Sequence, residues 1–597
     1  MQNDEQVSRR VFLERLAAGA LLGAAGACDR MALAQSGSGG WTPPPVLKNP
    51  NILIIMVDQM RPPMWMNSSQ LAGLSGTLPN IVGRIQNNSY NFEQFYVSAT
   101  ACTASRAGLL TGLYSPQTAM YVNADSAAFP SLNPAFPTWG QAVTALNPAY
   151  KGNLWWFGKW HLNPQTGKQP LAQYGFSTGK YPGTSPDEDP TGMANEGTDG
   201  GTFNGGGVWA SDAMIAEDFG NWLLGQQTYS GQPSSPWCAT VSLINPHDIC
   251  GAPAWFTLPT PPSGVPSEPV YFPPPVGSPN PPVPLFYPNG TPSPWNYENL
   301  SSVPNKPTLQ VQYANYLNGY VGTVNSWQLY LNQYFWMQTL VDIQVGNVLN
   351  ALQASAFNNN TIVIFLSDHG EYAGSHGCRL KGFGVYDESI RVPFCVRFPG
   401  QTGSISMNQT CSGVDFFGLI CDLATGGSWQ WRLAYPDLAN RQSMWSFLYN
   451  NSTETRIAPA PVGIPYILHT FDAGPQFNKS HIVCLRTGAA KLAFYSDWNS
   501  CSVIPNSTPP DAEFYDYTTN SSEMGNDYQN PPYPATLSNH EQVLGSWGPP
   551  GSGLIGTELN APLIGTGNDG NPLSEAQANA QQAYFNYFSG TGSCTGI

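Results

Sequence analysis

NILIIMV, residues 51–57, is an almost unbroken apolar run that ends in Asp58. A run of this kind, in which polar and apolar residues do not alternate, is typical of a strand in the centre of a parallel sheet. TIVIFL at 361–366 is a second such strand, and Asp368 and His369 follow it closely. Ligand-binding residues of open α/β sheets gather at the carboxyl ends of strands. The carboxylate and imidazole side chains therefore predict a site for Ca, Mg or Mn, although a lone aspartate after a strand more often caps a turn.

CTASRAGLLTG, residues 102–112, has a polar start that runs into an apolar pattern, which is typical of a helix N-terminus. Cys102 would then lie where backbone N–H groups and the positive end of the helix dipole stabilise negative charge, with Arg106 one turn later. The sequence therefore predicts a cysteine of low pKa. The alternative is a buried helix-start cysteine that acts as a small hydrophobic residue.

Two further strand-like runs end in lysine or histidine. GKWHL follows the aromatic run 153–157, and Lys159 and His161 would face the same side of an extended segment, as a shared anion requires. Their ordinary roles would be those of a solvated lysine and a structural histidine. His247 follows the apolar run 237–244, so it would lie at the same edge of the sheet, unless it is a turn histidine without a role.

These blocks together resemble the type I sulfatases, which are formylglycine-dependent enzymes of the alkaline-phosphatase superfamily. CTASRAGLLTG resembles the signature whose cysteine is oxidised to formylglycine, and SDHGEYAGSHG, residues 367–377, resembles the family's second metal block. The resemblance covers roughly residues 49–530, with five separated blocks in family order. The family usually has proline at the position of Ala104 and a second aspartate at that of Gln59, and many arylsulfatases have asparagine at that of His369.

The resemblance implies an α/β fold, with an alkaline-phosphatase-like central mixed sheet flanked by helices and a smaller C-terminal antiparallel-sheet domain. We expect a sulfatase catalytic domain over residues 48–470 and the smaller domain with its tail over 471–597. Residues 251–306 are rich in proline and would be an insertion that shapes substrate access. Helical spacing over 309–356 carries an aromatic stripe that we expect in the core.

The resemblance also implies a mechanism for an arylsulfatase- or choline-sulfatase-like enzyme. The hydrated formylglycine at position 102, a gem-diol, would attack the sulfur of a sulfate ester. One divalent metal, calcium in preference to manganese or magnesium, would polarise the sulfate, and the implied ligands are Asp58, Gln59, Cys102, Asp368 and His369. The implied catalytic residues are Cys102 as nucleophile, Arg106, Lys159 and Lys381 as sulfate-binding cations, His247 as acid for the leaving alcohol, and His161 as base for the second hydroxyl.

Two other functions remain open from the residues. Glutamine at the position of Gln59 and histidine at that of His369 also favour relatives that hydrolyse phosphonate or phosphate esters with the same catalytic residues. With Ala104 in the signature, the chain could instead be an unconverted, non-catalytic protein that binds a sulfated ligand.

The N-terminal segment, residues 1–34, has the features of an export signal. Arg9 and Arg10 resemble a twin-arginine motif, the apolar run 16–27 is too short to span a bilayer, and small residues end at Ala34. We expect the protein to be periplasmic or secreted. Its partners would be the twin-arginine machinery during export and a formylglycine-generating enzyme during maturation. Cys28 could mark a lipoprotein instead, but the residues before it lack the usual leucine.

Charge and cysteine content limit the partners. The net charge of -15 and the lack of a basic cluster disfavour nucleic acid as a partner. No other apolar run is long enough to predict a transmembrane segment. The chain without its signal has 19 Lys and Arg (23 less four), which predicts a small or sparsely sulfated substrate. In an oxidising compartment some cysteines should form disulfides, and the nearest pairs are Cys411 with Cys421 and Cys484 with Cys501.

Overall fold

Alternate side chains of the buried strands point to opposite faces of one sheet. In β1 (Asn51–Asp58), Ile52 and Ile54 pack into one apolar cluster while Leu53 and Ile55 pack into another. All of these side chains are completely buried. A strand that is buried on both faces has no polar side, which explains the unbroken apolar run in the sequence.

The computed structural model describes residues 41–64, 66, 68–123, 129–163, 171–178, 210–226, 233–251, 296–324, 327–453, 455–474, 477–497, 510–546 and 551–590. The signal predicted for residues 1–34, with Cys28, lies outside these ranges, as do Cys501 and most of the predicted insertion. No helix within these ranges is both long enough and apolar enough to cross a membrane.

A mixed eight-stranded sheet forms the centre of the fold, in the order β5-β4-β6-β1-β7-β8-β2-β9. The strands from β5 to β7 run parallel, whereas β8 pairs antiparallel with both β7 and β2. After β1, its strands in chain order are β2 (Tyr90–Phe92), β4 (Leu154–Gly158), β5 (Ser177–Thr178), β6 (Cys238–Pro246), β7 (Thr361–Ser367), β8 (Phe394–Arg397) and β9 (Ile405–Met407). The short strands β3 (Phe95–Tyr96) and β10 (Cys411–Ser412) form a separate two-stranded parallel sheet.

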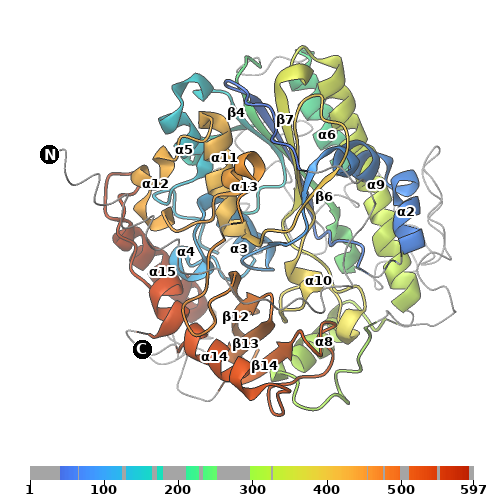
Figure 1. Ribbon diagram of the computed structural model, residues 1–597, viewed down its shortest axis with the longest axis vertical. Coiled ribbons are helices and arrows are strands. Elements are labelled where there is room, and N and C mark those ends of the chain that lie inside the picture. The colour runs from blue at the N-terminus through green and yellow to red at the C-terminus, as the bar shows by residue number, and fades with distance from the viewer. Residues whose placement is uncertain are drawn as a thin grey trace. The chain divides into compact units, whose positions relative to one another are not determined.

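Helices cover both faces of this sheet (Figure 1). On one face lie α3 (Cys102–Thr111), α5 (Trp139–Leu146), α11 (Phe416–Thr425) and α13 (Met444–Asn450). On the other lie α6 (Ala210–Leu223) and α9 (Trp327–Ala354). The remaining helices are α2 (Ser68–Thr77), α4 (Ser115–Thr118), α8 (Thr308–Tyr320), α10 (Asp387–Ile390), α12 (Gln430–Ala434), α14 (Pro534–Leu544) and α15 (Leu573–Gly590).

A separate four-stranded antiparallel sheet follows in the chain. Its strands are β11 (Tyr466–Asp472), β12 (His481–Thr487), β13 (Ala490–Ser496) and β14 (Asp511–Asp516), in that spatial order. Leu544 of α14 packs with Leu485 and Leu492 of this sheet. The two sheets confirm the predicted fold class. The division at residue 470 stays a prediction, and β11 lies across it.

Two local predictions differ from the structure. The helical stretch predicted for 309–356 is divided into α8 and α9, with Gly322 at φ +83° between them, although Tyr330, Phe335 and Trp336 are buried as expected.

The predicted disulfide between Cys411 and Cys421 is wrong, because both are free thiols. Cys411 in β10 directs its Sγ toward the Gln409 carbonyl at 3.6 Å, and Cys421 is buried in α11. Cys484 is also free, and every cysteine in the described part of the chain is a thiol.

Candidate active site

The carboxyl ends of four parallel strands meet at one edge of the central sheet. Asp58 ends β1 and pairs with Pro246 at the end of β6, beyond a shift of register after Met56, and Val57 pairs with Ser367 at the end of β7. The Lys159 amide continues the pairing of β4 by donating to the Ser242 carbonyl at 2.9 Å. The residues that follow these strands are therefore brought together, as the sequence predicted.

The helix α3 brings Cys102 to this edge. Cys102 is its first residue and lies after Ala101, which has an extended backbone. The helix ends at Gly112, whose φ of +71° is a left-handed conformation that glycine adopts without strain. The predicted helix start is confirmed, and the side chain of Cys102 is fully buried at the positive end of the helix dipole.

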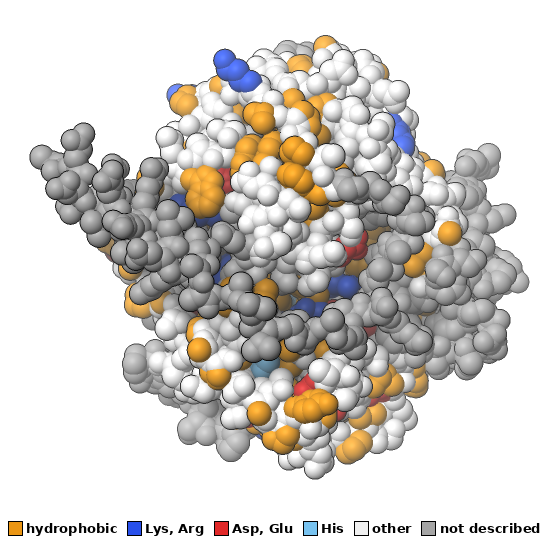
Figure 2. Space-filling model, viewed as in Figure 1, with side chains coloured by type: hydrophobic (Ala, Val, Ile, Leu, Met, Phe, Trp, Pro, Cys, Tyr) orange, Lys and Arg blue, Asp and Glu red, His pale blue; other side chains and the backbone are white. Residues whose placement is uncertain are grey.

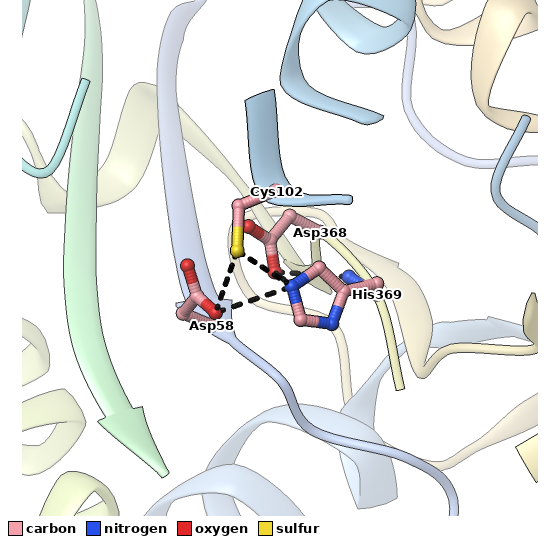
Figure 3. A group of neighbouring side chains, drawn as sticks. All are labelled: Asp58, Cys102, Asp368 and His369. Carbon is pink, nitrogen blue, oxygen red and sulfur yellow. Dashed lines mark hydrogen bonds and ion pairs between the residues drawn. The ribbon is translucent and has the colours of Figure 1, made fainter. Parts of the chain in front are cut away.

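We call Asp58, Cys102, Asp368 and His369 the nucleophile cluster, and Figure 3 shows their side chains converging. Cys102 Sγ lies 2.9 Å from His369 Nε2 and 3.8 Å from Asp58 Oδ1. His369 Nε2 lies 3.4 Å from Asp58 Oδ1 and 3.8 Å from Asp368 Oδ1. Three of these four distances exceed ordinary hydrogen bonds, so the atoms surround a common point more than they bond to one another.

His369 presents one defined nitrogen to this cluster. Its Nδ1 lies 3.0 Å from the Gly370 carbonyl, which can only accept a hydrogen bond. The proton of the neutral ring is therefore on Nδ1, and the lone pair of Nε2 faces Cys102 and Asp58.

Arg106 joins the two aspartates from the opposite side. Its Nε donates to Asp368 Oδ2 at 2.8 Å and its Nη2 donates to Asp58 Oδ2 at 2.9 Å. Its Nη1 donates to the Lys159 carbonyl and to Ser242 Oγ, each at 2.9 Å. One buried guanidinium thus holds four strands, β1, β4, β6 and β7, and the helix α3 in a fixed arrangement.

Two lysines complete the positive lining of the site. Lys159 Nζ lies 3.1 Å from Asp58 Oδ2. Lys381 Nζ donates to Gln59 Oε1 at 2.5 Å. Gln59 therefore directs its amide oxygen toward Lys381, and the second lone pair of that oxygen remains for another partner. Figure 2 shows Lys and Arg side chains recessed in the middle of the viewed face.

The two predicted acid–base histidines flank the cluster without joining it. His247 follows β6, and its Nδ1 lies 3.9 Å from both Asp248 Oδ1 and Cys250 Sγ. The His161 carbonyl accepts a hydrogen bond from Thr103 Oγ1 at 2.9 Å, which places this residue beside the start of α3. His161 has φ +60°, so its segment is not extended as the sequence suggested.

The electrostatics of the nucleophile cluster favour anions at Cys102 and Asp58. Burial and Asp58 raise the pKa of Cys102, but Lys381, His369 when its ring is protonated, and Lys159 outweigh them and hold it well below its ordinary value. Burial likewise raises the pKa of Asp58, and the positive groups around it, first among them Lys159, hold it well below its ordinary range. Burial and the Asp58 charge raise the pKa of Asp368 to about 6. The site is thus arranged around negative charge at its centre.

A second buried group of histidine and acids lies near residue 376. His376 Nδ1 is 3.0 Å from Glu298 Oε2, and His376 Nε2 is 3.4 Å from Glu388 Oε2. Glu523 is close to the same histidine. We call Glu298, His376, Glu388 and Glu523 the His376 cluster. It adjoins the site, since the Gly370 amide donates to the Ser389 carbonyl at 2.9 Å and the Glu371 amide to the Glu388 carbonyl at 3.0 Å.

Sequence reasoning missed two residues that support the site. Ser242 accepts from Arg106, yet it lies inside the apolar strand β6 and carries no signal of its own. Glu371 accepts a hydrogen bond from Gln59 Nε2 at 2.5 Å. It stands within the SDHGEYAGSHG block, so its position after Asp368 and His369 was the available signal.

Comparison with known proteins agrees with this fold. The chain is 26% identical over 363 residues to the ulvan-active sulfatase of Formosa agariphila, a match that covers 59% of this chain and 56% of that protein. A 2-O GAG sulfatase has a similar fold, with 20% identity, a TM-score of 0.57 and coverage of 83% of this chain and 91% of that one. The phosphonate monoester hydrolase of Silicibacter pomeroyi also shares the fold, with 17% identity, a TM-score of 0.55 and coverage of 82% and 93%.

The chain thus spans little more than half the length of the ulvan-active sulfatase that it matches. The family assignment rests on a broader match, because the model of the Sulfatase family matches residues 50–427. This segment is more than half of the chain and contains every residue of the nucleophile cluster. The chain therefore belongs to the sulfatase family.

Proposed function

We propose that the chain hydrolyses a sulfate ester with residue 102 as the nucleophile, after oxidation of Cys102 to formylglycine. One observation carries the proposal: Cys102 lies at a helix start among Asp58, Asp368 and His369, and three cations surround the group. Negative charge on the cysteine position and positive charge around it are what transfer of a sulfuryl group requires.

The residues of the nucleophile cluster fit a divalent metal. Their donor atoms all lie within 4.8 Å of one another, and they combine carboxylate oxygens with the lone pair of His369 Nε2. Asp58, Asp368, His369 and residue 102 would hold the metal, and Gln59 could add its amide oxygen. Carboxylate and amide oxygens suit calcium, magnesium and manganese alike, and our preference for calcium rests on the resemblance to the family. When bound, such an ion polarises the oxygens of the ester as a Lewis acid.

The chain's own cations would bind and orient the sulfate. Arg106, Lys159 and Lys381 approach the cluster from different elements, so they can contact different oxygens of one tetrahedral anion. Their positions are fixed before substrate arrives, because Arg106 is tied to both aspartates and Lys381 to Gln59. Preorganised positive charge stabilises the transition state without reorganisation at the moment of reaction.

Two histidines would transfer protons, one as the alcohol leaves and one after it has left. His247 protonates the oxygen of the departing alcohol, and His161 accepts a proton from a hydroxyl at position 102. The support for His247 is its place at the end of β6 near Asp58, and the support for His161 is its bond to Thr103 at the start of α3.

Two measurements test this function. Peptide mass spectrometry across Cys102 should find formylglycine, and an unmodified cysteine in protein that hydrolyses no sulfate ester would leave a sulfated-ligand binding protein as the better description. Matched sulfate, phosphate and phosphonate esters of one alcohol should then be compared. Gln59, which replaces a carboxylate by a neutral amide, favours the second candidate, a phosphonate or phosphate ester hydrolase. Faster turnover of the phosphorus esters would support that candidate.

We further propose a small or sparsely sulfated substrate of the arylsulfatase or choline-sulfatase kind. The chain without residues 1–34 has only 19 Lys and Arg (23 less four), so an extended polyanion would find little to bind. Tight binding of a heavily sulfated polysaccharide that weakens strongly with salt would contradict this. Export through the twin-arginine route, after conversion by a formylglycine-generating enzyme, remains our proposal for localisation in the periplasm or outside the cell.

A further inference from the structure

Glu371 is fully buried directly behind Gln59 and Lys381. Its Oε2 accepts a hydrogen bond from Gln59 Nε2. Its Oε1 accepts hydrogen bonds from the backbone amides of Ala373 at 2.8 Å and Leu380 at 2.7 Å. One carboxylate therefore ties the residue after β1 to the loop that carries Lys381.

The carboxylate of Glu371 also fixes which way the Gln59 amide points. An ionised carboxylate has no hydrogen to donate, so it must face the NH₂ group of Gln59. The amide oxygen must then face the other way, where it accepts from Lys381 Nζ at 2.5 Å. Tyr334 holds the backbone of the same residue, because its hydroxyl donates to the Gln59 carbonyl at 2.7 Å.

This arrangement keeps two opposite charges apart. Lys381 donates to a neutral amide oxygen, and the negative charge of Glu371 lies on the far side of that amide. If residue 59 carried a carboxylate, Lys381 would form a direct ion pair with it, and less of the lysine's field would reach a bound anion. The amide between them holds the lysine in place without neutralising it.

We propose that Glu371 is a positioning residue of this sulfatase, which orients the Gln59 amide so that a neutral oxygen holds Lys381 toward the sulfate. The inference rests on the proposed function in one respect, since it takes Lys381 to be a sulfate-binding residue. Glu371 acts through its hydrogen bonds with Gln59 and with the backbone of Ala373 and Leu380.

The first test is Glu371→Gln, which preserves shape but removes one acceptor. Hydrogen atoms of Gln59, Ala373 and Leu380 then meet a side chain with only one oxygen, so a donor must face a donor at one of the contacts. The dissociation constant for inorganic sulfate, measured by calorimetry on the full chain, should rise roughly ten- to a hundredfold, and the KM for a sulfate ester should rise in parallel.

A matched control is Glu513→Gln in β14. Glu513 is equally buried and accepts hydrogen bonds from Gln310 Nε2 at 3.1 Å and Tyr515 at 2.7 Å, but it belongs to the antiparallel sheet. This variant should lower Tm and leave the sulfate dissociation constant unchanged. If Glu371→Gln does the same, Glu371 is merely structural and the proposal is overturned.

A double variant separates the effect of the hydrogen bonds between residues 59 and 371 from the effect of the charge on residue 59. In Gln59→Glu with Glu371→Gln, the new carboxylate can accept from Lys381 and from the new amide, whose oxygen can accept from Ala373 and Leu380. Tm should therefore recover toward that of the wild type, while sulfate binding stays weak because Lys381 now faces a carboxylate.

Full recovery of sulfate binding in this double variant would overturn the proposal. The double variant tests the proposal even if Glu371→Gln alone does not fold. A wild-type protein that binds sulfate but hydrolyses no sulfate ester would refute the proposed function instead, since the comparison of dissociation constants would still test Glu371.

Discussion

The nucleophile cluster and the His376 cluster contain the same kinds of residue but differ in how their charges are paired. Both are buried, and both place a histidine among carboxylates within 4.8 Å. In the His376 cluster each acid has its own cation: Lys306 Nζ lies 3.0 Å from Glu298, Lys491 Nζ lies 2.5 Å from Glu523, and His376 serves Glu388. The acids there need no further partner.

The charges of the nucleophile cluster are paired differently. Its cations bind the outer oxygens of the aspartates, whereas Asp58 Oδ1, Cys102 Sγ and His369 Nε2 face one another across the centre. Residue type therefore does not distinguish a site from a structural cluster. The distinction lies in which atoms are left facing inward, and in the position at the carboxyl ends of strands.

Removing the nucleophile should have the largest effect. Cys102→Ala is expected to reduce kcat by a factor on the order of 10⁶, as loss of a nucleophile does in other enzymes with covalent catalysis. The measurement is initial-rate kinetics with a sulfate ester. Cys395→Ala is the control, because Cys395 is an equally buried thiol in the core. It should lower Tm and leave kcat unchanged, and substantial activity in Cys102→Ala would end the assignment.

Loss of a metal ligand should rank next. Asp368→Asn is expected to reduce kcat by about 10³ or more, because it removes charge stabilisation at the reacting group. A chelator should lower the Tm of the wild type but not of the variant, since a bound ion stabilises only the folded state.

Asp342→Asn is the matched control for this substitution. Asp342 is buried in α9 and accepts hydrogen bonds from the Asn80 and Ile81 amides, and it is not a member of the nucleophile cluster. The Asp342→Asn variant should have a lower Tm than the wild type. Its kcat and its response to the chelator should be unchanged. An Asp368→Asn enzyme that keeps full activity after chelation would refute the metal site.

The effect of His247→Ala should depend on the leaving group. General acid catalysis is worth about 10² to 10⁴ in rate, so alkyl sulfates should slow by that factor. Nitrophenyl sulfates, whose leaving group needs no proton, should slow much less. His161→Ala is the comparison, because its proton transfer follows departure of the alcohol and should slow both classes equally. Equal slowing of both classes by His247→Ala would instead make His247 a binding or structural residue.

The His376 cluster should affect stability alone. His376→Gln removes the charge that serves Glu388 and the hydrogen bond to Glu298, and it is expected to cost about 1–3 kcal/mol in the free energy of unfolding with kcat unchanged. Burial lowers the pKa of His376, but Glu388 and Glu298 outweigh burial and raise it.

The sign of the pH dependence follows from that shift. A histidine whose pKa is raised by folding contributes stability that is fully present below the ordinary value of 6.5 and is lost as the pH rises through the folded pKa. The difference in Tm between wild type and His376→Gln should therefore be largest in mildly acidic buffer and shrink in alkaline buffer. A difference that grows with pH would show that His376 is neutral in the folded protein.

The sequence predicted the strand ends and the start of α3 because each is a local pattern. Asp58, Cys102 and Asp368 follow apolar runs or open a helix, so their neighbours along the chain reveal them. Glu371 and Ser242 could not be assigned in this way, because their partners Gln59 and Arg106 are distant in sequence. His161 was expected in an extended segment, and its positive φ depends on tertiary contacts such as that with Thr103.

Gly370 joins the two clusters, and this has a consequence for local motion. A Cβ on this residue would lie 2.0 Å from the Glu388 carbonyl oxygen, so only glycine permits the contact. The amides of Gly370 and Glu371 donate across it to Ser389 and Glu388. These amides cannot reach solvent unless the backbone beside His369 separates from α10, which would break the His376 cluster as well. Their hydrogens should therefore exchange with deuterium only in openings close to global unfolding, which makes this junction a slowly exchanging part of the molecule.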